Sequence, residues 1–133
     1  HGDYKPIVFG PSSVQEMADC TSLAFDLADQ YRMTVMILAD GVLGQMMEPL
    51  TLGPKAHRDL PPKDWALTGR KGREQNIVRS LWLGDGVLEK HNEKLQAKYR
   101  EIQAKEVRCE EYRIEDAQKV RALMSSVTDA PQP

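Results

Sequence analysis

Two apolar runs near the N-terminus predict two strands of a parallel sheet. Residues 6–9, Pro-Ile-Val-Phe, are followed by Gly10-Pro11, which predicts a short buried strand. Residues 34–39, Thr-Val-Met-Ile-Leu-Ala, are apolar without alternation and rich in strand formers, which predicts a strand buried on both faces. With a helix between them, these strands would form a βαβ unit with a right-handed crossover.

The stretch between the two runs, residues 14–31, carries a helical pattern. Ser12 with Gln15, and Ser13 with Glu16, both fit the capping box that starts a helix. Two stripes of small or apolar side chains recur at the helical period, so we expect a helix that is covered on more than one side. The stripes are Met17, Thr21, Ala24 and Ala28, and Cys20, Leu23, Leu27 and Tyr31.

The middle of the chain predicts a linker. Four prolines and one glycine lie between residues 48 and 64, and this density favours an ordered, extended path over a surface. Residues 76–83 are more apolar, but their period is ambiguous, and they predict either a strand or one irregular helix.

The last long pattern predicts a surface helix. Asp85 is a candidate N-cap for a helix that runs to about Val107, with Leu88, Leu95 and Ile102 spaced by seven residues. Only this narrow stripe is apolar, and charged side chains occupy the other faces. We therefore expect the helix to lie on a surface or against a partner.

Size and composition limit the class of protein. The chain has 133 residues, which suffices for one modest domain, and 41% hydrophobic with 29% charged residues is ordinary globular usage. The net charge of -2 gives no long-range attraction to nucleic acid or to an anionic membrane. Since no apolar run has the length of a spanning helix and no signal-peptide pattern opens the sequence, we expect a cytoplasmic protein.

The residue types that carry most chemistry lack the necessary spacing. Cys20 and Cys109 are far apart and belong to no C-x-x-C pair, which argues against an iron–sulfur or zinc site on this chain. His1, His57 and His91 are isolated from one another along the sequence. We therefore predict no catalytic residue and no metal ligand here.

Residues 69–73, Gly-Arg-Lys-Gly-Arg, form a basic stretch that could bind a phosphate through its flexible backbone and three cations. No aromatic residues are interleaved with the cations, as they are in proteins that bind single-stranded nucleic acid. A solvated loop is the favoured interpretation.

The segment after the second predicted strand is the candidate interface. It follows the carboxyl end of the strand, where open α/β sheets place their ligands, and it contains adjacent methionines, whose side chains adapt to irregular apolar surfaces. A role in filling the core remains the alternative. The candidate residues are Asp40, Gly41, Gly44, Gln45, Met46, Met47 and Glu48.

A family resemblance is carried by segments that together span nearly the whole sequence: 2–8, 11–17, 23–29, 31–32, 35–41, 43–49, 65–69, 91–92, 95–96, 98–99, 107–108, 111–112 and 115–117. In these segments the sequence resembles one family, the α subunits of 2-oxoacid:ferredoxin oxidoreductases. The branch it resembles most is 3-methyl-2-oxobutanoate dehydrogenase (ferredoxin), with 2-oxoglutarate and pyruvate relatives as the alternatives.

The resemblance implies where this sequence belongs in the subunit. Residues 1–50 would be the C-terminal strand, helix and strand of a thiamine-diphosphate pyrimidine-type domain, residues 51–84 a linker, residues 85–117 a long helix and connector toward a second α/β domain, and residues 118–133 an irregular tail. In this family the residues that meet the cofactor and substrate lie largely earlier in that domain. No catalytic or cofactor-binding residue is therefore carried over.

Cofactors and partners are also implied by the resemblance. The parent complex would use thiamine diphosphate with Mg²⁺, coenzyme A and ferredoxin, and its iron–sulfur clusters would lie on other chains or domains. This chain alone would bind no cofactor and be inactive. Its partners would be the other subunits of an oligomeric complex, with no nucleic acid and no membrane.

Three functional classes remain open at this point. The first is a structural segment of the subunit, internal or truncated because the pattern after Ala117 departs from the family. Its complex would oxidatively decarboxylate a 2-oxoacid, 3-methyl-2-oxobutanoate, to the acyl-CoA and reduce ferredoxin. The second is a non-catalytic interaction module that acts through its incomplete sheet and long helix. The third and least favoured is a nucleic-acid binder that uses Arg70, Lys71 and Arg73.

Overall fold

The computed structural model is an α/β structure in two compact units and describes residues 5–53, 58–109, 111 and 114–115. The first unit is His1–Pro61 with Arg113–Pro133, and the second is Pro62–Tyr112. The elements in chain order are β1 (Ile7–Phe9), α1 (Val14–Tyr31), β2 (Val35–Ile37), η1 (Leu43–Gln45) and α2 (Val87–Glu106). The expected α/β class, with a parallel pair of strands followed by a long helix, is confirmed.

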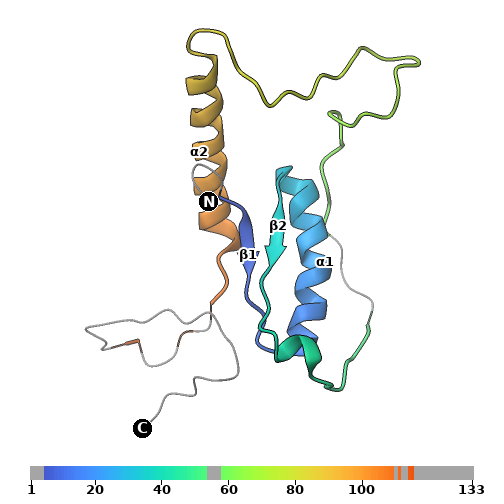
Figure 1. Ribbon diagram of the computed structural model, residues 1–133, viewed down its shortest axis with the longest axis vertical. Coiled ribbons are helices and arrows are strands. Elements are labelled where there is room, and N and C mark those ends of the chain that lie inside the picture. The colour runs from blue at the N-terminus through green and yellow to red at the C-terminus, as the bar shows by residue number, and fades with distance from the viewer. Residues whose placement is uncertain (1–4, 54–57, 110, 112–113, 116–133) are drawn as a thin grey trace. The chain divides into compact units, whose positions relative to one another are not determined.

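The first unit is built on a parallel pair of strands. β1 pairs with β2, and α1 connects them as the crossover that parallel strands require (Figure 1). The pairing continues one residue past β2, where the amide of Leu38 donates to the carbonyl of Phe9 at 2.8 Å. The register pairs Ile7 with Val35, Val8 with Met36 and Phe9 with Ile37. The predicted βαβ unit is therefore present.

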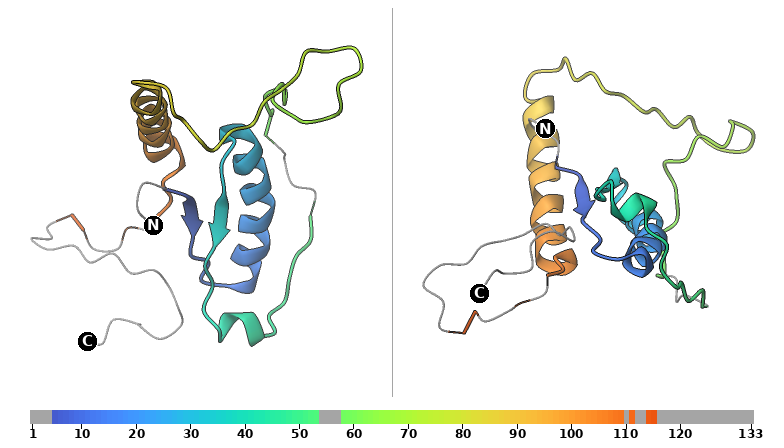
Figure 2. Two further views of the ribbon diagram at one scale, coloured as in Figure 1. Left: turned by 45° about the horizontal axis from the view of Figure 1, so that its top comes forward. Right: turned by 60° about the horizontal axis from the view of Figure 1, so that its bottom comes forward.

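One face of this sheet is better covered than the other. Ile7 and Phe9 are buried, whereas Val8 and Met36, which pair across the strands, are exposed together with Leu38. Two views show α1 beside β2, and among the described elements of this unit it is the helix that packs on the sheet (Figures 1 and 2). Because one helix covers one face, the prediction that residues 34–39 are buried on both faces is wrong for the described chain.

α1 begins as the serines predict, with one change of partner. The side chain of Ser13, the N-cap, accepts from the amide of Glu16 at 3.1 Å. The carboxylate of Glu16 reaches back to the amide of Ser12 at 2.7 Å, one residue earlier than in a standard capping box. Of the two expected stripes, the one that ends at Leu27 and Tyr31 supplies these two buried residues, and the third buried residue of the helix, Asp26, belongs to neither stripe.

The linker of the second unit, residues 62–86, contains neither helix nor strand. The prediction of a strand or an irregular helix over residues 76–83 is therefore wrong. These side chains are apolar but mostly exposed, and no described strand pairs with them. Without a pairing strand or a surface to bury them, the apolar residues have no reason to adopt a regular period.

α2 starts two residues later than Asp85, so the prediction of Asp85 as its N-cap is wrong. The N-cap is Gly86, in the left-handed conformation at φ 67°, and no side chain caps the helix. The turn closes through the backbone, with the amide of Val87 donating to the carbonyl of Gly84 at 3.2 Å. Glycine reaches this conformation without the cost that a Cβ adds, which explains why a backbone turn replaces the expected carboxylate cap.

α2 carries its least exposed side chains along a single stripe. This stripe ends in the buried residues Tyr99, Ile102 and Glu106, and the remaining faces are largely exposed and charged. Within the part of the chain that is described, no helix is long and apolar enough to cross a membrane. The predicted irregular tail, residues 118–133, lies outside the described residues, as do His1 and His57.

Leu27 provides the test of this fold. It is 0% exposed, whereas Phe25, two residues earlier in α1, is 73% exposed. We expect Leu27→Ala to lower the free energy of unfolding of the chain by about 2–5 kcal/mol, because it leaves a cavity. Phe25→Ala should change it by no more than about 0.5 kcal/mol. Urea unfolding followed by helical circular dichroism measures both, and equal effects would contradict this packing.

Candidate functional site

The loop that follows β2 lies at the same end of the sheet as the start of α1. This follows from the parallel pairing, because both strands end at that edge. The loop turns through η1, where the amide of Gly44 donates to the carbonyl of Asp40 at 3.1 Å and that of Met46 to the carbonyl of Val42 at 3.0 Å. Figure 1 shows η1 next to the first turn of α1.

Glu48 ties this loop to the N-terminus of α1. Its carboxylate accepts from the amide of Val14, the first residue of the helix, at 2.8 Å. The first amides of a helix have no partner within it, and they lie at the positive end of the helix dipole. A half-buried carboxylate therefore satisfies a free donor and stabilises the helix end at once.

Gln15 makes a second tie from the same helix turn. Its side-chain oxygen accepts from the amide of Thr51 at 2.9 Å, and its side-chain nitrogen lies 3.4 Å from the carbonyl oxygen of Thr51. One amide side chain thus pairs with both polar groups of a single backbone residue. Together with Glu48, it clamps the loop between residues 40 and 51 against α1.

The clamped loop has one buried anchor and several exposed apolar side chains. Leu43 is 2% exposed, whereas Met47 is 98% exposed, and Val42, Leu50 and Leu52 are also exposed. The predicted interface residues divide in the same way: Asp40, Met46 and Glu48 are half-buried, and Gly41, Gly44, Gln45 and Met47 are exposed. All seven lie on this one loop. The loop therefore combines a backbone tied to α1 with several exposed apolar side chains.

The chain after the loop is tied to α1 further along the helix. The guanidinium of Arg58 donates to the side-chain oxygen of Gln30 at 2.9 Å, and its amide lies 3.4 Å from the carboxylate of Asp26. Asp26 is buried, and burying a carboxylate without a hydrogen bond costs free energy. The amide of Arg58 supplies such a hydrogen bond. The start of the linker therefore follows α1.

The basic stretch at residues 69–73 uses one cation to hold its own loop. The guanidinium of Arg73 donates to the carbonyls of Glu74 at 2.8 Å and Ala66 at 3.3 Å. The side-chain nitrogen of Asn76 donates to the carbonyls of Asp64 at 2.6 Å and Ala66 at 3.1 Å. Arg73 is therefore engaged with backbone carbonyls of its own loop.

Residues with potential for metal or redox chemistry are placed apart. Over residues 5–53, 58–109, 111 and 114–115, no group of three His, Cys, Asp or Glu side chains could hold a metal ion. Cys20 is half-buried in α1 and Cys109 is exposed. His91 stacks on Trp82 with ring centroids 4.7 Å apart and an interplanar angle of 25°, which ties the end of the linker to α2.

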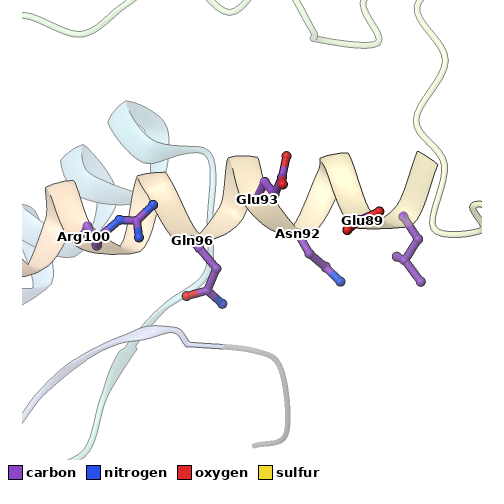
Figure 3. A pocket seen from close by; sticks show the side chains of 6 residues that line it. Glu89, Asn92, Glu93, Gln96 and Arg100 are labelled. Carbon is purple, nitrogen blue, oxygen red and sulfur yellow. The ribbon is translucent and has the colours of Figure 1, made fainter. Parts of the chain in front are cut away.

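A shallow hollow on α2 does not form a cofactor site. It is lined by Leu88, Glu89, Asn92, Glu93, Gln96 and Arg100, all from this one helix (Figure 3). Side chains of a single helix cannot enclose a ligand, and bound cofactors are largely enclosed.

The comparison with known families decides where this chain belongs. Residues 2–121 match the family described as pyruvate flavodoxin/ferredoxin oxidoreductase, thiamine diP-bdg. The chain belongs to this family. The match confirms the resemblance expected from the sequence, and the parallel sheet with its crossover helix is consistent with a fragment of a thiamine diphosphate-binding domain. No solved structure matched the chain.

Curated relatives in this family are named as oxidoreductase subunits. Ketoisovalerate oxidoreductase subunit VorB of Methanothermobacter marburgensis is 49% identical over 118 residues, which is 89% of this chain and 34% of the relative. VorB of Methanothermobacter thermautotrophicus is 48% identical over the same shares. The 2-oxoglutarate synthase subunit KorA of Methanocaldococcus jannaschii is 50% identical over 52 residues, 39% of this chain and 14% of the relative. The chain spans about a third of the length of VorB.

Sequence reasoning placed the loop but missed how it is held. The bond from Glu48 to Val14 joins residues 34 apart, and the Gln15–Thr51 pair joins residues 36 apart. No local period or motif marks such pairs. The one available signal was geometric: a loop after β2 and a helix after β1 must meet at the same end of a parallel sheet.

Removing the carboxylate of Glu48 tests the clamp. We expect Glu48→Ala to leave the amide of Val14 without its partner and to speed its hydrogen exchange roughly 2- to 30-fold, as for loss of a helix cap. Glu48→Gln, which keeps an acceptor oxygen, should exchange at an intermediate rate. Glu93→Ala, on the exposed face of α2, is the control and should leave Val14 unchanged. Exchange measured residue by residue by NMR gives the result, and an unchanged Val14 in Glu48→Ala would contradict the clamp.

The loop at residues 64–76 offers a separate test. Asn76→Ala removes both bonds to the carbonyls of Asp64 and Ala66, so the loop should open more often and trypsin should cut faster after Arg70 and Lys71. Gln75→Ala changes an exposed neighbour and serves as the control. Cleavage followed by mass spectrometry measures the rates. If the two variants are cut equally fast, Asn76 does not hold the loop.

Proposed function

We propose that this chain is a segment of the α subunit of a thiamine diphosphate-dependent 2-oxoacid:ferredoxin oxidoreductase. The complex oxidatively decarboxylates ketoisovalerate, which is 3-methyl-2-oxobutanoate, and transfers the acyl group to coenzyme A. The two electrons released reduce ferredoxin. The chain itself contributes architecture and contact surfaces, and other parts of the complex carry the chemistry.

The identity to VorB carries this proposal. Relatives named for ketoisovalerate align over 118 residues at 48–49% identity, whereas relatives named for 2-oxoglutarate align over 52 to 55 residues. An alignment of 118 of the 133 residues extends through the linker and the long helix. This favours a branched-chain 2-oxoacid over 2-oxoglutarate or pyruvate.

The position of the chain within the subunit follows from the same proposal. Residues 1–50 form the C-terminal part of the pyrimidine-type domain, residues 51–84 the linker, residues 85–117 the long helix and connector, and residues 118–133 the tail. Thiamine diphosphate, its Mg²⁺ and the substrate meet residues outside this chain.

The clamped loop serves as a docking surface in this proposal. Asp40, Gly41, Gly44, Gln45, Met46, Met47 and Glu48 hold their shape before any partner arrives, since Glu48 and Gln15 fasten the loop to α1. Met47 supplies the adaptable apolar contact. The partners are other subunits of a cytoplasmic oligomeric complex, with coenzyme A and ferredoxin reached through the complex and iron–sulfur clusters on other chains.

The alternative is a non-catalytic module that acts by itself. The exposed sheet face at Val8, Met36 and Leu38 favours it, because a module of that kind needs an open apolar surface. The same face is equally consistent with a domain that the rest of the subunit completes. Activity of the complete complex separates the two.

Reconstitution tests the proposed activity. The complete subunit that contains this sequence is assembled with its partner subunits, thiamine diphosphate, Mg²⁺, coenzyme A and oxidised ferredoxin. We expect ferredoxin reduction with 3-methyl-2-oxobutanoate, at a kcat/KM roughly tenfold or more above that with 2-oxoglutarate or pyruvate. The 133-residue chain alone under the same conditions should reduce no ferredoxin.

Two outcomes would contradict the proposal. A preference of the complex for 2-oxoglutarate would place the chain in the KorA branch. Turnover by the chain alone would mean that this chain holds the catalytic groups.

A further inference from the structure

The linker of the second unit exposes a short apolar segment. Ile77, Val78, Leu81 and Leu83 are between 58% and 85% exposed, and they fall within seven residues. Scattered apolar side chains are ordinary on a surface, but four in one short segment form a contiguous patch of the kind that marks an interaction site. Segment 77–83 contains no proline, and its β-branched residues favour a strand.

The segment is held at both ends while its centre has no partner. Asn76 donates to the carbonyls of Asp64 and Ala66 at one end, and Trp82 stacks on His91 at the other. Among the described residues, none from 77 to 81 makes a hydrogen bond. Figure 1 shows the chain before α2 as an extended trace without helix or strand. The segment therefore presents free backbone donors and acceptors, and the contacts at Asn76 and Trp82 fix the positions of its two ends.

The positive charge next to segment 77–83 indicates which kind of partner surface could cover it. Residues 69–79 carry four cations, Arg70, Lys71, Arg73 and Arg79, and one anion, Glu74, so their net charge is 4 − 1 = +3. The whole chain has a net charge of -2. Three of the four cations are arginines, which are enriched at protein–protein interfaces, whereas lysine is depleted there. A complementary surface carries carboxylates around an apolar strip.

We propose that segment 77–83 adds as a strand to the edge of a β-sheet on another subunit of the oxidoreductase complex, at an apolar edge bordered by carboxylates. Strand addition uses the free amides and carbonyls for affinity and alternate apolar side chains for specificity. The inference rests on the proposed function for the identity of the complex. The ties at Asn76 and Trp82 preorganise the segment within its own unit, as expected for a surface that meets a separate subunit with little rearrangement.

Hydrogen exchange on the intact subunit tests the occupant. The complete subunit is measured alone, at two concentrations, and in the assembled complex. We expect the amides of segment 77–83 to exchange quickly in the free subunit and at least roughly tenfold more slowly in the complex. Protection already present in the free subunit would overturn the proposal, because the subunit's own remaining chain, or a second copy if the protection grows with concentration, then covers the segment. No protection in the complex would overturn it as well.

A matched pair of substitutions gives an independent readout. Leu81 and Leu67 lie in the same linker, and each is 67% exposed. Leu81→Asp places a carboxylate against the acidic border and should weaken association of the subunit with its partners at least roughly tenfold, measured as Kd by titration. Leu67→Asp, outside the segment, should leave Kd unchanged, and equal weakening by both would overturn the proposal. A complex that protects segment 77–83 but reduces no ferredoxin contradicts the proposed function and leaves this inference standing.

Discussion

Parallel pairing of β1 with β2 is the constraint on which the rest of the first unit depends. Two strands that run the same way cannot be joined by a tight turn, so the chain must cross over, and α1 is that crossover. The pairing brings the end of β2 and the start of α1 to one edge. Only because of this can the carboxylate of Glu48 reach the amide of Val14, and Gln15 reach Thr51.

Features that depend on neighbouring residues could be predicted from the sequence. α1 covers Val14–Tyr31 as expected, because the serines before it supply a side-chain oxygen for its free amides. The two strands were marked by apolar runs ending in glycine or aspartate. The contacts of Glu48 and Gln15 could not be predicted, since they depend on how distant segments meet, and many polar side chains in the loop could have made them.

In the second unit, local sequence patterns did not predict the start of α2 or the structure of the linker. Asp85 has a good capping side chain, yet the backbone turn at Gly84 and Gly86 starts α2 without it. Segment 77–83 is apolar but forms neither a helix nor a strand, so its apolar composition does not predict its secondary structure. The family could be recognised although the sequence contains no short catalytic motif, because family recognition uses similarity spread over residues 2–121. Neither the sequence nor the structure assigned a cofactor-binding residue.

In the proposed subunit, the remaining chain covers the exposed sheet face at Val8, Met36 and Leu38, and this would limit how this part of the family can diverge. Side chains that are covered by another piece of protein must change in step with that piece, as core residues do. A chimera that exchanges residues 5–53 between two relatives would bring together contact surfaces that have not evolved together. The boundaries at which such subunits recombine during evolution should therefore fall outside residues 5–53.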